Sequence, residues 1–179
     1  MRKTALILGF LLATTLTVSA QTNTSPWTWQ FQGGYNSSSK WLKDGWMGST
    51  GIGYNFTDNF RLGLDLGYWQ GRIKDADAHD HLWSFMINPE YDYNINNQNQ
   101  VYVFAGLGFA RRATANFLTA PGMWNHFDSQ TKWAGDAGIG YRYFVNRAVG
   151  LTAQLQYTHM AFSQKLDTAD ARVGVIIRF

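Results

Sequence analysis

His159 is the residue of this sequence whose type and surroundings best suit catalysis. A histidine can act as a general base for a hydroxyl nucleophile when the two side chains come within hydrogen-bonding reach. Ser163 shares the face of His159 in an extended chain, but four residues of strand separate them by about 13 Å. A catalytic pair therefore requires the chain to bend after Ala161, with Asp167 or Asp170 orienting the imidazole. The alternative is an interfacial histidine among aromatic residues with no catalytic role.

A second group of residues with metal-binding chemistry occupies alternate positions, namely Asp75, Asp77, His79 and His81. In an extended chain these side chains share one face, and carboxylate and imidazole groups together can bind a divalent ion. Their spacing fits no recognised metal motif. Because surface loops often carry such polar groups, we favour a solvated loop and expect neither a metal nor another cofactor.

The elements that would position these residues are eight segments in which apolar and polar residues alternate, the pattern of β-strands. The connections alternate in length. Short ones occupy 57–59, 94–100 and 145–147, and longer ones occupy 36–45, 71–81, 111–131 and 162–168. Short periplasmic turns with longer external loops are typical of outer-membrane barrels. The sequence therefore predicts an all-β fold, an eight-stranded antiparallel up-and-down transmembrane β-barrel.

The apolar face of these strands carries nearly twenty aromatic rings. The interior of an eight-stranded barrel is only wide enough for its own side chains, so the rings are expected to face lipid. There they form two belts at the membrane interfaces, as transmembrane barrels require. The lipid-interface aromatic residues that we select are Trp27, Trp29, Tyr54, Trp83, Tyr93, Trp133, Tyr143 and Phe179.

The opposite face lines the interior and carries five basic and five acidic side chains. Buried charges need partners, because their desolvation is otherwise too costly. We therefore interpret this set as a structural ion-pair network, the alternative being a narrow channel for small solutes. A filled eight-stranded interior leaves little room for such a channel. The central members are Arg61, Asp65, Glu90, Asp92, Lys132, Asp136, Arg142 and Arg172, and Asp170 and Arg178 complete the set.

The first twenty residues have the features of a cleaved export signal. Arg2 and Lys3 precede an apolar run that is too short for a membrane-spanning helix, and small residues lead to cleavage after Ala20. The barrel domain is then 21–179. Cleavage removes two of fifteen basic residues and leaves all twelve acidic ones, so the mature chain is nearly neutral. It lacks the excess of basic residues expected of a protein that binds nucleic acid. The absence of cysteine excludes disulfides and a lipid-anchored cysteine.

The motifs within the strands carry a family resemblance. The segments 51–54, 56–60, 138–143 and 175–179 resemble those of the small outer-membrane β-barrel superfamily of OmpA/OmpX-type, porin-family proteins. The resemblance implies the outer membrane of a Gram-negative bacterium, contact with its lipid and lipopolysaccharide, and recognition of Phe179 by the barrel-insertion machinery. It favours a monomer without fixing the oligomeric state. Members include adhesins, envelope-stabilising proteins and a few lipid-modifying enzymes.

Segment 157–161 also looks like the histidine-containing strand of lipid A deacylases, which are barrels of this size. Those enzymes have a serine two residues after the histidine, where this chain has Ala161. The leading hypothesis is therefore a non-catalytic barrel with a structural, envelope-stabilising or surface-interaction role. A deacylase-like hydrolase using His159, or a narrow solute channel, is the alternative.

The longest connection, 111–131, is rich in apolar residues. An apolar segment outside a cell suggests contact with a partner or with lipopolysaccharide. It could equally fold over the barrel mouth as a plug, and both alternatives remain open. At the start of this segment, Arg111 and Arg112 have the chemistry to meet lipid phosphates.

Overall fold

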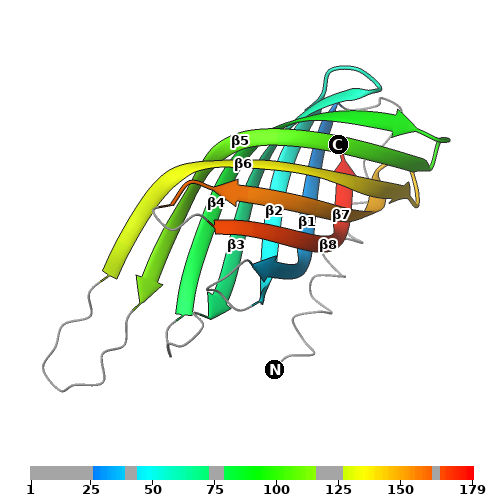
Figure 1. Ribbon diagram of the computed structural model, residues 1–179. Helices are drawn as coiled ribbons and strands as arrows, with labels where there is room; N and C mark the ends of the chain where they lie inside the picture. Colours follow the sequence, from blue (N-terminus) through cyan, green and yellow to red (C-terminus); the bar gives the residue numbers. More distant parts are fainter. Residues whose placement is uncertain (1–25, 39–43, 73–78, 116–126, 163–165) are drawn as a thin grey trace, which may run out of the picture.

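The computed structural model describes residues 26–38, 44–72, 79–115, 127–162 and 166–179. They form one closed antiparallel barrel in which each strand pairs with the next and the last pairs with the first (Figure 1). This confirms the predicted eight-stranded fold. No helix that could cross a membrane occurs in these ranges. The proposed signal, 1–20, lies outside the described residues. The strands are β1 (Trp27–Ser38), β2 (Gly45–Asn55), β3 (Phe60–Arg72), β4 (His79–Asn94), β5 (Asn99–Ala115), β6 (Phe127–Phe144), β7 (Val149–Met160) and β8 (Leu166–Arg178).

The wall of the barrel is uneven in height. Strands β4, β5 and β6 have 16, 17 and 18 residues, whereas β7, β8, β1 and β2 have 12, 13, 12 and 11. Figure 1 shows β5 and β6 reaching farthest toward the lower left, and β3 stays paired with β4 up to Arg72 opposite His79. The barrel therefore presents a tall side and a low side at its long-loop end.

The long connections are shorter than the sequence suggested. Pairing between β5 and β6 continues to Ala115 opposite Phe127, so much of the expected loop 111–131 is strand. Likewise β3 continues to Arg72 and β4 begins at His79, within the expected loop 71–81. The strands extend because an antiparallel hairpin keeps pairing its backbone groups after the polar sequence has broken the alternation. Residues 116–126 lie outside the described part, so whether they plug the mouth or bind a partner stays an open prediction.

The three short turns lie together at the opposite end of the barrel and are held by side chains. Asn96 Oδ1 accepts hydrogen bonds from the backbone amides of Gln98 and Asn99, at 2.9 and 2.8 Å. Asn146 Oδ1 accepts them from Ala148 and Val149 in the same way, at 2.9 and 2.8 Å. Asparagine is favoured in turns because its side chain can satisfy the backbone in this manner. The turns fix the register of each hairpin and hence the face on which every side chain lies.

Candidate functional site

The interior next to the short turns is filled by a charged layer of four side chains. Glu90 lies between two arginines, with Oε1 3.2 Å from Arg61 Nη1 and 2.6 Å from Arg142 Nη1. Arg142 also contacts Asp92, with Nη1 2.8 Å from Oδ1. All four are buried, and the Arg142 guanidinium lies over the Tyr102 ring, 3.7 Å from its centroid. Two cations and two carboxylates thus neutralise one another, which is the arrangement that burial demands.

Two glycines make room for this layer. A Cβ at position 53 would lie 2.0 Å from Arg61 Nε, and one at position 140 would lie 2.2 Å from the Tyr102 ring. Each large side chain therefore lies flat across the backbone of a neighbouring strand. The glycines on the interior face are required by this close approach.

Above the charged layer, the remaining interior acids are held mainly by amides. Asp65 accepts hydrogen bonds from Gln30 Nε2 and Asn88 Nδ2, at 3.0 and 2.9 Å. Asp136 accepts one from Gln156 Nε2 at 2.8 Å. The count of five basic and five acidic residues therefore does not translate into five ion pairs. These amides were not identified as site residues from the sequence, although alternation places them on the interior face.

A further acid, Asp170, completes the polar part of the interior. Its carboxylate contacts Arg172, with Nη2 2.7 Å from Oδ2, and accepts a hydrogen bond from Asn36 Nδ2. All three side chains are buried. The interior ion pairs of the described residues thus fall into two groups, the Arg61–Glu90–Arg142–Asp92 layer and this pair nearer the long-loop end.

The interior toward the long-loop end is closed by apolar side chains, which we call the apolar layer. A cavity of about 20 Å³ lies beneath it, between Trp69, Met86 and Asp170. That volume holds about one water molecule, which is far from a solute path. This layer could not be predicted from the sequence, because isolated inward apolar residues do not disturb the alternation pattern. Its members are Met47, Trp69, Leu82, Met86, Ala110, Ala134, Met160, Phe162 and Leu166.

Two predicted interior charges lie elsewhere. Lys132 is exposed and forms no part of the buried network. The pairing of β6 with β7 begins only at Ala134. Lys132 therefore lies beyond the end of β7, which does not cover its side chain. Arg178, at the other end, is partly exposed and lies over the Phe144 ring, 3.6 Å from its centroid. The prediction for Lys132 is therefore wrong.

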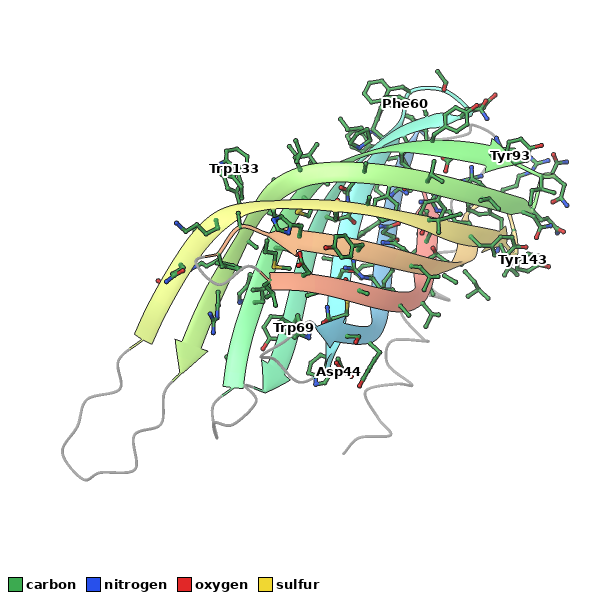
Figure 2. All side chains as sticks on the ribbon, in the orientation of Figure 1. Asp44, Phe60, Trp69, Tyr93, Trp133 and Tyr143 are labelled. Atoms are coloured by element: carbon green, nitrogen blue, oxygen red, sulfur yellow. The ribbon has the colours of Figure 1, made fainter. Side chains whose placement is uncertain are left out.

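The selected aromatic residues all lie on the outward face, seven of them exposed and Tyr54 half-buried. Figure 2 shows Tyr93 and Tyr143 at the short-turn end and Trp133 projecting from β6 toward the long-loop end. At the chain terminus, the backbone amide of Phe179 donates to the carbonyl of Trp27 at 3.1 Å. Two belts of rings therefore bound the outer surface of the barrel.

His159 lies on the outward face near the end of β7, and Asp167 of β8 holds it. His159 Nδ1 lies 2.6 Å from Asp167 Oδ1. Asp170 points inward and does not meet the imidazole. Ser163 lies outside the described residues, and Ala161 offers no hydroxyl. The described residues therefore provide an oriented histidine without a nucleophile beside it.

The predicted metal-binding group is only partly described. Asp75 and Asp77 lie outside the described residues. His81 is on the outward face, with Nδ1 2.7 Å from the Tyr68 hydroxyl. Within the described ranges, no three metal-ligating side chains come together.

The comparisons with known proteins agree with this architecture. Residues 8–179 match the outer membrane protein beta-barrel domain. The chain belongs to this family. A search of curated protein sequences finds no match.

Solved structures show the same fold at low sequence identity. Neisserial surface protein A (NspA) is 20% identical, with a TM-score of 0.73, covering 88% of this chain and all of its own. Ail, the attachment invasion locus protein of Yersinia pestis, is 16% identical, with a TM-score of 0.56, covering 85% and 98%. The N-terminal β-barrel of Pseudomonas aeruginosa OprF is 19% identical, with a TM-score of 0.55, covering 88% and 100%. The chain is therefore a small bacterial outer-membrane barrel.

Proposed function

We propose that this chain is a non-conducting, non-catalytic outer-membrane barrel that stabilises the envelope and presents its tall β4–β6 wall outside the cell. The filled interior carries this proposal. The charged layer and the apolar layer close the barrel at two levels, and the cavity between them holds about one water molecule. A long-loop end that faces outward follows the usual orientation of such barrels. Phe179, at the opposite end, is where we propose that the insertion machinery binds.

Planar-bilayer recording tests the closed interior. The protein extracted in detergent is expected to insert without discrete conductance steps at any voltage that the membrane tolerates. A variant with both Trp69→Ala and Met86→Ala thins the apolar layer but leaves the charged layer, so it should also be silent. Regular conductance steps from the unaltered protein would refute the proposal.

The envelope role is tested in cells. A deletion strain is expected to become more sensitive to a hydrophobic antibiotic or to detergent, and the unaltered chain should restore resistance. An unchanged deletion strain would remove the envelope-stabilising role. The relatives include an attachment invasion locus protein, which supports surface interaction as the other form of this role.

The second candidate is a lipid A deacylase-like hydrolase, which the contact between His159 and Asp167 favours. An acid that fixes the imidazole is the usual support for a histidine general base. Against it, position 161 is alanine, so a hydroxyl would have to come from Ser163. Mass spectrometry of lipid A from cells with His159→Ala separates the two functions. An unchanged acyl number supports the barrel without catalysis, and an added acyl chain supports the hydrolase.

A further inference from the structure

Arg111 is an unusual residue on the outside of the barrel. It lies on β5 in outward alternation with Leu107 and Phe109, and it is exposed. Among the outward strand positions whose side chains the structure describes, only Arg111 and Asp167 carry a formal charge. A cation on the lipid-facing surface of a barrel is destabilising near the middle of the bilayer and tolerated near its interface. The position of Arg111 along β5 therefore decides whether its charge is tolerated in the membrane.

The neighbours of Arg111 set its level relative to the membrane. Directly opposite it on β4 is Trp83, which is 55% exposed and lies against Tyr68, with ring centroids 4.7 Å apart. Phe109 and Trp133 form a second pair with centroids 4.2 Å apart, and Arg111 follows Phe109 by two residues. Aromatic rings of this kind mark the boundary between hydrocarbon and headgroups. Two residues of strand add about 7 Å, so the guanidinium reaches the headgroup level.

The two outward charges differ in how they are neutralised. Asp167 is bound by His159 within the barrel itself. Arg111 has no ion pair or hydrogen bond to any side chain in the described part of the protein, and no acidic residue shares the described outward faces of β3 to β6. None of the described residues therefore supplies its counter-charge, and a lipid anion can do so. At this level of the outer leaflet, the anions are the phosphates of lipopolysaccharide.

We propose that Arg111, beside Trp83 and above the Phe109–Trp133 pair, binds a phosphate group of lipid A on the outer surface of β4–β6. A guanidinium presents a planar fork of donors that matches phosphate oxygens, and the rings beneath it contact the sugar and the first carbons of the acyl chains. The inference deepens the proposed envelope role and rests on it for the outward orientation of the long-loop end.

Native mass spectrometry of the detergent-extracted protein with bisphosphorylated lipid A tests the site. Arg111→Gln is expected to weaken binding about tenfold, the size of effect that loss of a charged hydrogen bond produces. Arg111→Lys should retain part of the affinity. Lys132→Gln is the matched control, because it also removes one exposed positive charge at this end of the barrel but lies on the interior side of the wall. Lys132→Gln should bind as the unaltered protein does, and equal binding by Arg111→Gln would overturn the proposal.

Two further ligands separate lipid A from other sources of the same chemistry. Dephosphorylated lipid A is expected to bind as weakly to the unaltered protein as bisphosphorylated lipid A binds to Arg111→Gln. Competition by phosphatidylglycerol or by millimolar inorganic phosphate as effective as that by lipid A would show a general anion contact and refute the lipid A site. A conducting barrel that still loses lipid A on Arg111→Gln would refute the proposed closed barrel alone, so the two failures are distinguishable.

Discussion

The charged layer and the apolar layer close the same barrel by opposite means. Near the short turns, Glu90 bridges Arg61 and Arg142, and Asp92 contacts Arg142. Near the long loops, aliphatic and aromatic side chains such as Trp69 pack together without polar links. A buried ion pair loses much of its attraction to desolvation but becomes very costly when one partner is removed. An apolar side chain contributes through its volume and contacts. The two layers should therefore respond differently to substitution.

The largest difference is expected at Glu90. Glu90→Leu leaves Arg61 buried without its carboxylate partner and Arg142 paired with Asp92 alone, and we expect a loss of about 3–5 kcal/mol in the free energy of unfolding. Urea titration of the protein in lipid vesicles, followed by tryptophan fluorescence, measures it. The control is the double variant Glu90→Leu with Arg61→Leu, which restores charge balance. It should recover much of the loss, and a double variant less stable than the single one would contradict the ion-pair account.

In the apolar layer, Met86→Ala is expected to cost about 2–3 kcal/mol, because the methionine is 3% exposed and its removal leaves a cavity. The same urea titration applies. Met86→Leu keeps the volume and should cost less than about 1.5 kcal/mol. A loss for Met86→Ala as large as that for Glu90→Leu would remove the distinction between the layers.

The different chemistry of the two layers also explains which of them the sequence could reveal. Arg61, Glu90 and Arg142 stand out because charge is rare in a strand that faces lipid on its other side. Alternation therefore placed them inside correctly. Met86 and Trp69 also occupy inward positions. Because they are apolar, their residue type alone does not distinguish them from residues of the lipid-facing side.

Lys132 shows a different limit of the sequence. Alternation along β6 correctly places Lys132 on the inward face. Whether an inward side chain is buried also depends on the neighbouring strand, and β7 ends before it reaches the level of Lys132. Likewise, the contact between His159 and Asp167 depends on the register of β7 against β8. The sequence named Asp167 only as one of two acids that could orient the imidazole. The face on which a strand residue lies can be predicted from local alternation in the sequence. The length and register of a strand depend on its pairing with the neighbouring strand.

A smaller effect tests the space that the charged layer needs. Gly140→Ala places a Cβ against the Tyr102 ring, which itself lies against Arg142. The ring has to shift, and we expect a loss of about 1–2 kcal/mol from overpacking. Gly135→Ala, on the outward face of the same strand, is the matched control. There the Cβ would meet a Leu107 carbon at 3.5 Å, an ordinary contact, so stability should hardly change. Equal losses for the two variants would show a general backbone effect of glycine replacement.

The smallest effect is expected at Arg178, where an aromatic ring takes the place of a carboxylate. The guanidinium lies 3.6 Å from the centroid of the Phe144 ring at the short-turn end. A partly exposed contact of this kind contributes about 0.5–1 kcal/mol, so Arg178→Gln should lower stability by about that amount. In a Phe144→Leu background, Arg178→Gln should no longer change the free energy of unfolding. The double variant Phe144→Leu with Arg178→Gln therefore separates the contact between the guanidinium and the ring from simple packing. If Arg178→Gln costs the same in both backgrounds, the arginine stabilises the barrel through water or lipid contact. In that case, the end of β8 would resemble the outward surface around Arg111.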